Sequence, residues 1–317
     1  GGSGGGPGDV APEPGKALIA RSRRVSEVRQ DASEYYEVFG GPGAVVHRDA
    51  HMVTMKARHR KSGRLRAHKA PKDGIDDLEL FIRHASALQK CDHPHICKLF
   101  EVFFGGEVPC QIMELCAGRS LASVCKGERA LFSSEVVPAL LARQVLSAVG
   151  HVHAHGICHL QLTAEDYFFT QAISGKAQPP LADLNVKLAS LGLAECIDPC
   201  LPELSPKALG SAYHSTGQAP EQVIETKDRP VRSDRCDVWA VGIVAFLALI
   251  GVWPVVKRGA ISGGADAWRG ASAKAKDYLH AALAVPPKAR PSAEALIQES
   301  LWLQSVQPAL DENIRRL

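Results

Sequence analysis

Apolar and polar residues alternate between residues 44 and 70, and turn-forming residues such as Gly63 interrupt the alternation. This pattern predicts three antiparallel strands joined by tight turns. Residues 97–104 and 108–115 are predicted to form two further strands. Residues 76–90 instead carry apolar side chains at helical spacing, at Leu78, Phe81, Ile82, Ala85 and Leu88. Five antiparallel strands and one helix therefore predict a small N-terminal lobe of α+β structure.

In the rest of the chain the spacing of apolar residues becomes helical, most clearly over residues 134–155. Residues 238–256 are almost uncharged and nearly long enough to cross a membrane. Three features favour instead a buried core helix that ends near Gly251: Asp237 lies directly before the segment, Pro254 lies inside it, and no basic cluster flanks it. We therefore expect a mostly helical C-terminal lobe and no membrane span.

The composition of the 317 residues, 45% hydrophobic and 22% charged, suits a folded chain with a substantial core. The net charge of +3 is too small to indicate a nucleic-acid partner by itself. The nine cysteines form neither a CxxC pair nor a tight sequence cluster with histidines, which favours reduced thiols in the cytoplasm. Cys196 and Cys200 have a spacing found in metal sites, but no second pair accompanies them, so no metal site is predicted.

Seven short motifs occur in the order, and at nearly the spacing, of those in protein kinases. They are RAHK at residues 66–69, HPHI at 93–96, MEL at 113–115, RQVLS at 143–147, APE at 219–221, CDVW at 236–239 and ARPSA at 289–293. Each motif alone is weak, but in this order they make the chain resemble the protein kinase fold. The RQVLS and CDVW motifs are similar to those of the calcium-dependent and calmodulin-dependent kinase group.

The resemblance implies an α+β, bilobal protein-kinase-like fold, with a five-stranded antiparallel sheet and helix C in the N-lobe and a mostly helical C-lobe. Four segments are expected: a disordered linker or extension at residues 1–33, the N-lobe at 34–116, the C-lobe at 117–303 and a C-terminal tail at 304–317. No calcium-binding loop of the D-x-D-x-D-G type occurs, so calcium regulation would have to come from sequence outside this chain.

Phosphoryl transfer depends on charges placed around the γ-phosphate, and the resemblance puts uncharged side chains at several of those positions. Gln161 stands at the catalytic aspartate, and a carboxamide cannot accept the proton of a substrate hydroxyl. Ser190 stands at the magnesium-binding aspartate of the DFG motif, and His84 at the helix-C glutamate. Asp166, at the metal-binding asparagine, keeps one potential ligand, although a solvated or capped loop aspartate fits it at least as well.

The resemblance assigns nucleotide contacts to the strand lysine and the hinge, at Lys69, Met113, Glu114 and Cys116. Without a glutamate on helix C, we expect Lys69 to lack its usual partner and to move freely. The loop expected to cover the phosphates, near residues 47–51, contains no glycine, although close approach of backbone N–H groups requires it. Phe168 stands where kinases place a smaller apolar residue, and its ring could partly fill the adenine pocket. We therefore expect no cofactor, or at most weak ATP binding.

Residues that hold a kinase fold together are retained. The resemblance matches Glu221 and Arg290 to a buried ion pair, and Asp237 to a carboxylate that binds backbone N–H groups of the catalytic loop. A retained scaffold without the charges for transfer predicts a pseudokinase, acting as a scaffold or regulatory module on an unidentified protein partner, with no nucleic-acid partner. Two alternatives stay open: an atypical active serine/threonine kinase in which Asp166 and Glu165 bind metal, and a sensor that binds ATP without using it.

Overall fold

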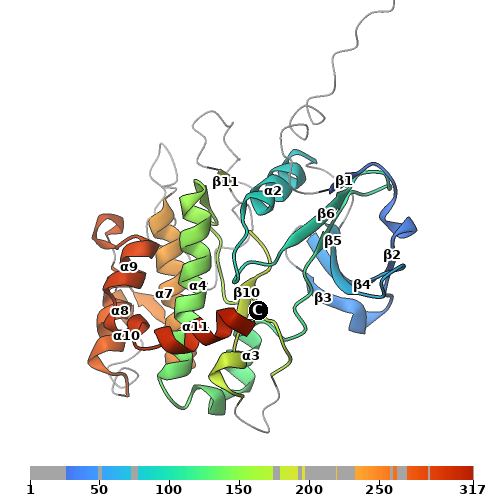
Figure 1. The fold of residues 1–317 in the computed structure, drawn as a ribbon. Helices are drawn as coiled ribbons and strands as arrows, with labels where there is room; N and C mark the ends of the chain where they lie inside the picture. Colours follow the sequence, from blue (N-terminus) through green and yellow to red (C-terminus); the bar gives the residue numbers. More distant parts are fainter. Residues whose placement is uncertain are drawn as a thin grey trace, which may run out of the picture.

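The structure is a computed structural model that describes residues 26–48, 52–72, 78–173, 179–191, 195–196, 219, 233–257, 260–262, 270–284 and 286–316. Figure 1 shows two lobes, one built on a sheet and the other mostly helical. This is the bilobal α+β architecture predicted from the sequence.

The N-lobe contains a seven-stranded sheet in the order β1-β6-β7-β5-β4-β2, with β3 paired to β4. Its strands are β1 (Ser26–Val28), β2 (Tyr36–Val38), β3 (Val45–Arg48), β4 (Met52–His59), β5 (Leu65–Pro71), β6 (Leu99–Phe103) and β7 (Cys110–Met113). Two 3-10 helices accompany them, η1 (Ala32–Glu34) and η2 (Pro42–Ala44). The five predicted antiparallel strands correspond to β3–β7, while β2 is an additional antiparallel strand and β1 pairs with β6 in parallel.

The first described residues extend this sheet, in contrast to the disordered extension that we expected over residues 1–33. Ala32 and Tyr36 enter a small apolar cluster with Phe103, and Val28 packs against it. Burying these side chains stabilises the segment, and its local composition gives no sign of this long-range contact. For residues 1–25 the expectation lies outside the described residues.

Helix α2 (Leu78–Lys90) packs against β6 on the side of the sheet that faces the C-lobe (Figure 1). The four described apolar residues of its predicted stripe are all buried, namely Phe81, Ile82, Ala85 and Leu88. The helix ends where the N–H of Cys91 donates to the carbonyl of Leu88 at 3.1 Å. The helical spacing therefore identified the buried face of α2 correctly.

The C-lobe is mostly helical, with short strands near the junction of the lobes. Its helices are α3 (Leu121–Gly127), α4 (Val136–Ala154), α7 (Asp234–Ile250), α8 (Ala273–Ala282), α9 (Ala293–Glu299), α10 (Leu301–Gln304) and α11 (Gln307–Arg316). Its 3-10 helices are η3 (Arg129–Phe132), η4 (Leu181–Asp183) and η5 (Pro287–Ala289). Its strands are β8 (Ile157–Cys158), β9 (Tyr167–Phe169), β10 (Val186–Leu188), β11 (Glu195–Cys196), β12 (Val255–Lys257) and β13 (Ala260–Ser262).

Helix α7 forms the buried centre of the C-lobe and packs against α4. The hydroxyl of Ser233 caps its N-terminus by accepting from the N–H of Arg235. Gly251 ends the helix at a φ of 87°, in the left-handed region that glycine adopts without strain. The helix thus ends where the sequence predicted. Within the part of the chain that the structure describes, no helix is both long and apolar enough to cross a membrane.

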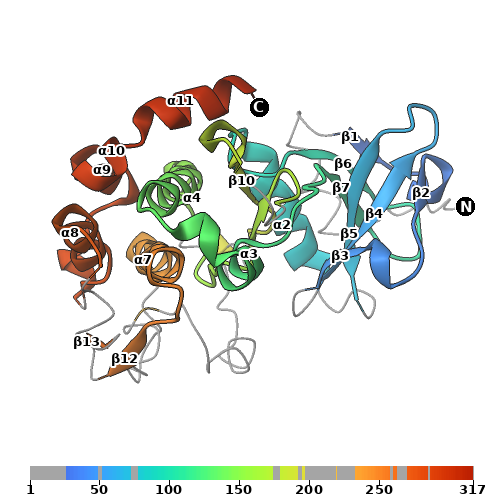
Figure 2. The same ribbon diagram turned by 90° about the horizontal axis from the view of Figure 1, so that it is seen from below.

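The segment expected as a C-terminal tail contains α11, which lies against η4 and beside α4 on the outside of the C-lobe (Figure 2). The side-chain amide of Asn313 is fully buried and donates to the carbonyl of Leu184 at 3.1 Å. Leu310 is buried on the same helix. These contacts attach the tail to the lobe.

Arg290 joins η5 to the start of α7, although its side chain is only 2% exposed. Its guanidinium lies over the ring of Trp239, with 4.9 Å between Cζ and the ring centroid. Nε donates to the carbonyl of Ala284 at 2.6 Å, and Nη1 donates to the carbonyl of Arg235 at 3.0 Å. The predicted partner Glu221 lies outside the described residues, so this pairing stays a prediction.

We expect Arg290→Ala to lower the free energy of unfolding by about 3 kcal/mol, because a hydrogen bond to a charged group contributes roughly 1.5–3 kcal/mol and two are lost. Arg290→Lys keeps the charge but cannot reach both carbonyls with a planar fork, so it should lose an intermediate amount. Denaturant titration of the three proteins measures both losses. An unchanged transition midpoint in Arg290→Ala would contradict the expectation.

Candidate functional site

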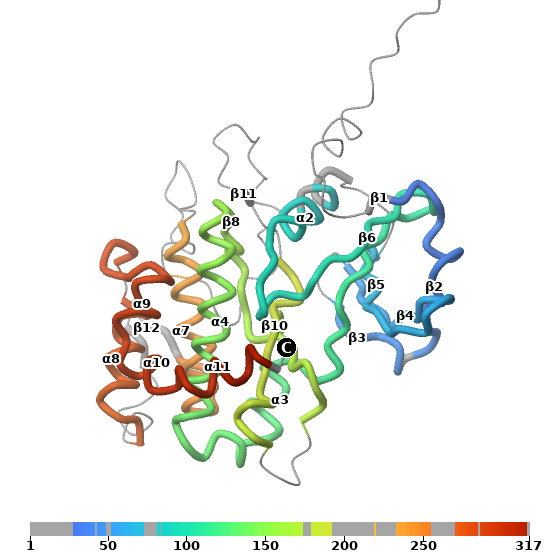
Figure 3. Tube along the Cα trace, viewed as in Figure 1, coloured from blue at the N-terminus to red at the C-terminus, as the bar shows by residue number. Residues whose placement is uncertain are grey.

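The residues that the resemblance assigned to nucleotide binding and transfer are carried by elements of both lobes, and Figure 3 shows β5, α2 and β10 around the junction of the two lobes. β5 carries Lys69, and α2 carries His84. The loop from β8 to β9 carries Gln161 and Asp166, and Ser190 follows β10. The fold therefore gathers side chains from both lobes into one candidate active site.

Asp237 organises the loop between β8 and β9 from inside the C-lobe. Its carboxylate is 1% exposed, and it accepts from the N–H groups of His159 and Leu160 at 2.8 and 2.7 Å. His153 adds a third contact, with its Nε2 2.9 Å from the same carboxylate. These are the loop contacts that the resemblance implied for Asp237. They also hold Leu160 at a φ of 63°, a conformation that costs energy in residues other than glycine.

Lys69 is held in place, so the expectation that it would move freely is wrong. Its side chain is 2% exposed, and Nζ donates to the hydroxyl of Ser190 at 3.0 Å. The backbone carbonyl of Ser190 in turn accepts from Nε2 of His159 at 2.9 Å. The residue at the magnesium-ligand position therefore binds the lysine directly, in a contact that sequence reasoning missed.

His84 occupies the helix-C position beside this pair as a buried, neutral imidazole. Its Nε2 accepts from the N–H of Leu191 at 3.3 Å, so the proton of the neutral ring resides on Nδ1. Nδ1 lies 3.1 Å from the side-chain nitrogen of Gln111. A proton on Nδ1 pairs with this amide when the amide is turned so that its oxygen faces the ring. Burial, and secondly the charge of Lys69, hold the pKa of His84 well below 6.5. The His84 ring therefore fills the space beside Lys69 as a neutral group that contacts Gln111 and Leu191.

Asp166 is engaged by its own loop. One carboxylate oxygen accepts from both the N–H and the hydroxyl of Thr163, at 2.7 and 3.0 Å. Glu165 next to it is exposed and accepts from the hydroxyl of Ser120. Gln161 is partly exposed. Of the two readings that the sequence left open for Asp166, these contacts favour the capped loop aspartate.

The hinge residues are placed unequally with respect to the cleft. Met113 is buried at the end of β7, and Glu114 accepts from Nζ of Lys187 at 2.7 and 2.9 Å. Cys116 lines a cavity of about 430 Å³ between the lobes. Lys187 escaped the sequence analysis, although a lone charged residue inside the buried strand Val186–Leu188 is a signal of a buried partner.

Phe168 lies in the same cavity and closes part of it. Its ring packs edge-on against His47 of β3, with 5.4 Å between the ring centroids. Strand β3 therefore contacts the C-lobe at Phe168 across this cavity. Whether the Phe168 ring fills the position of adenine stays a prediction.

The chain is similar in sequence and in fold to known proteins. The family model described as the protein kinase domain matches residues 50–302. A putative ribosomal protein S6 kinase alpha-1 from Caenorhabditis elegans is 27% identical over 95% of this chain and 37% of that protein. Serine/threonine-protein kinase 33 from Mus musculus is 25% identical over 88% of this chain and 58% of that protein.

Two further comparisons also match protein kinases. Calcium-dependent protein kinase 9 from Oryza sativa subsp. japonica is 29% identical over 67% of this chain and 35% of that protein. The solved structure of a twitchin kinase region from C. elegans superimposes with a TM-score of 0.70 at 21% identity, over 88% of this chain and 48% of that one. The chain spans from 35% to 58% of the length of these three curated relatives.

The lowered pKa of His84 predicts a pH dependence of stability. Below pH 6.5 the unfolded state gains a proton on His84 while the folded state does not, so the free energy of unfolding falls as the pH falls. The loss approaches about 1.4 kcal/mol per pH unit and ends at the folded-state pKa. We expect His84→Asn to lose less stability between pH 7 and pH 5 than the wild type does.

Urea titrations at both pH values measure this difference. His280→Gln, which removes an exposed histidine on α8, is the matched control and should behave like the wild type. Equal pH dependence in His84→Asn and the wild type would contradict the assignment of a buried neutral ring.

Proposed function

This chain belongs to the protein kinase domain family, and from that premise we propose that it is a pseudokinase, a module that regulates or scaffolds other proteins without transferring phosphate. Its partner is a protein that we do not identify. We further propose that it acts in the cytoplasm and binds ATP weakly, without magnesium, or not at all.

The contact between Lys69 and Ser190 carries this proposal. Kinases catalyse transfer by placing opposite charges around the phosphates, with an aspartate holding magnesium and the lysine directed at the nucleotide. Here a neutral hydroxyl stands at the position that the resemblance gives to the aspartate, and its oxygen accepts a hydrogen bond from the lysine at 3.0 Å. Magnesium prefers anionic oxygens, and a serine that already accepts from an ammonium group is a poor ligand for it.

The base position supports the same proposal. Gln161 cannot take a proton from a substrate hydroxyl, because a carboxamide is not basic. Two carboxylates follow it closely in sequence: Glu165 accepts from the hydroxyl of Ser120, and one oxygen of Asp166 accepts from the N–H and hydroxyl of Thr163. An atypical enzyme would have to bind metal with carboxylates that this loop already engages.

The cavity beside the hinge supports weak nucleotide binding at most. The Phe168 and His47 rings contact each other across this cavity, which supports the proposal that they limit the room left for an adenine ring. The charge near the phosphates would come mainly from Lys69, with no carboxylate at position 84 to direct it. The remaining opening of about 430 Å³ favours a nucleotide sensor as the second candidate.

We expect the purified chain to transfer no phosphate from radiolabelled ATP to itself or to generic substrates, with either magnesium or manganese present. Asp166→Ala is the informative control because Asp166 is the carboxylate that an atypical mechanism would use. Transfer by the wild type that disappears in Asp166→Ala would reject the pseudokinase proposal in favour of the atypical kinase.

Titration calorimetry with ATP tests the second part of the proposal. We expect weak binding that magnesium does not strengthen, and severalfold tighter binding by Phe168→Leu because a smaller side chain opens the pocket. The double variant His84→Glu with Ser190→Asp should acquire magnesium dependence, since it restores both carboxylates. His84→Gln with Ser190→Asn places neutral side chains of matching size there and should not.

Micromolar, magnesium-dependent binding of ATP by the wild type would contradict this expectation. Micromolar binding of ATP that is the same with and without magnesium would instead favour the nucleotide sensor over a pseudokinase that binds no nucleotide.

A further inference from the structure

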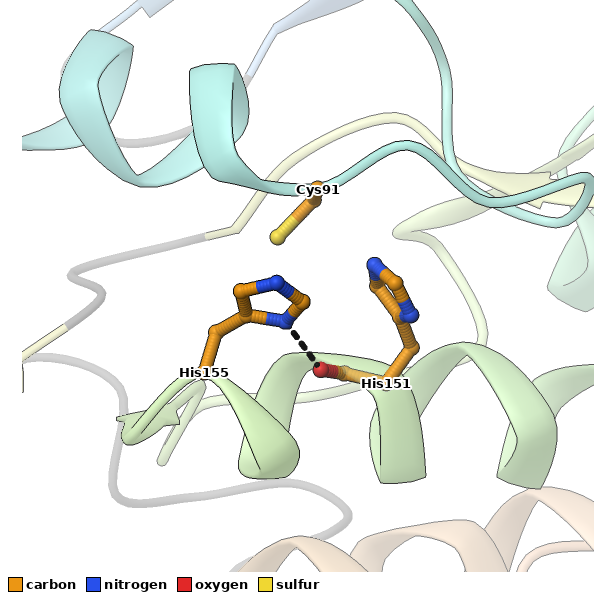
Figure 4. Close-up of side chains that lie close together, drawn as sticks. All are labelled: Cys91, His151 and His155. Atoms are coloured by element: carbon orange, nitrogen blue, oxygen red, sulfur yellow. Dashed lines mark hydrogen bonds between the residues drawn. The ribbon is translucent and has the colours of Figure 1, made fainter. Parts of the chain in front are cut away.

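A cysteine and two histidines meet behind the cleft, on the side away from the hinge cavity. Cys91 follows the last residue of α2, and His151 and His155 lie at the C-terminal end of α4. One potential ligand atom from each residue lies within 4.8 Å of the other two. Figure 4 shows the thiol and the two imidazoles facing a common space.

The two histidines are preorganised by the helix. Residues four apart on an α-helix project from the same face, as do the paired histidines of helical zinc sites. Nδ1 of His155 donates to the backbone carbonyl of His151 at 2.8 Å, which leaves the lone pair of its Nε2 free to bind a ligand. Metal-binding histidines are commonly oriented by such a bond from the second ring nitrogen.

A second observation that points to a ligand comes from His151. Its Nε2 is inaccessible to solvent, and it has no hydrogen-bond partner among the described residues. Buried polar atoms are normally satisfied, so an orphaned ring nitrogen in a cluster of this kind requires an explanation. His93 packs on the ring of His151 with 5.0 Å between centroids, but its own nitrogens contact Ser147 and the N–H of His95.

The electrostatic setting also favours a cation. The C-terminal end of a helix carries a partial negative charge, and His151 and His155 lie in the last turn of α4 and just after it. Asp92 follows Cys91 and adds a carboxylate near His151. Lys90 is the nearby opposing charge on α2, and it acts on Cys91 from the preceding position.

We propose that Cys91, His151 and His155 bind one Zn²⁺ ion. A thiolate with two imidazoles is a ligand set that zinc accepts at about 2.0–2.3 Å in tetrahedral geometry. Zinc bonds of about 2.0–2.3 Å in tetrahedral geometry put ligand atoms roughly 3.3–3.8 Å apart, so the three atoms, which lie within 4.8 Å of one another, need to move only slightly closer together. Water would supply the fourth ligand from the side of the exposed His155.

Zinc at this position would connect the end of α2 to the end of α4, and therefore the N-lobe helix to the C-lobe. Binding would release the proton of the Cys91 thiol, because zinc takes the thiolate. The ion would hold α2 in the position that buries His84 beside Lys69. The proposed site therefore has a structural role, and it does not depend on whether the chain transfers phosphate.

Titration of the metal-free 317-residue chain with Zn²⁺, in competition with a chromophoric chelator, tests the proposal. We expect one ion per chain and a melting temperature that rises with zinc concentration. Cys91→Ser, His151→Gln and His155→Gln should each weaken binding at least about 100-fold, because loss of an outer partner alone already costs roughly 10–100-fold. Co²⁺ in place of zinc should give a thiolate charge-transfer band that Cys91→Ser lacks.

The controls remove similar residues elsewhere. Cys125→Ser replaces another buried thiol, and His280→Gln replaces an exposed histidine, so both variants should bind zinc as the wild type does. The double variant Cys196→Ser with Cys200→Ser removes the pair that the sequence offered as an alternative and should also bind normally. The proposal is overturned if the wild type binds no zinc at micromolar concentration, if Cys91→Ser binds as tightly as the wild type, or if the Cys196 and Cys200 variant alone loses the ion.

Discussion

The loop between β8 and β9 depends on one buried carboxylate. Asp237 lies in the first turn of the central helix α7 and accepts two backbone N–H groups of the loop and the ring of His153. Loss of one of these partners would leave a buried charge without compensation. The contact with Asp237 is therefore kept although it holds Leu160 in an unfavourable backbone conformation. The positions of Gln161 and Asp166, and through His159 that of Ser190, follow from this attachment.

On that framework the cleft replaces charge pairing with neutral hydrogen bonds. An ammonium group in a site of low dielectric needs a partner, and Lys69 has the hydroxyl of Ser190 within 3.0 Å. A neutral His84 fits beside the lysine because a charged imidazole there would be repelled. These side chains are mutually compatible as they stand, which suits a protein whose cleft is proposed to be structural.

Helix α2 has contacts on the side of the cleft and, beyond its C-terminal end, with helix α4. On the cleft side, His84 contacts the N–H of Leu191 and the amide of Gln111. On the far side, Cys91 faces the last turn of α4, where the zinc ion is proposed to bind. In active kinases the position of this helix determines whether the lysine and its glutamate meet. In this chain the same helix is held by residues that carry no negative charge toward the lysine.

The two lobes, the strands β3–β7 and the main helices could be predicted from the sequence, because periodicities of two and 3.6 residues record which face of each element is buried. The resemblance also pointed to Gln161, Ser190 and His84 as uncharged side chains at charged positions of kinases, since these lie in or near short motifs. The contacts of these side chains could be read only from the three-dimensional structure. Ser190 is remote from Lys69 in sequence, and Cys91 is remote from His151, so no local pattern relates them. The strand at Ser26–Val28 was missed for the same reason, because its pairing with β6 is a contact between distant segments that the composition of either segment does not encode.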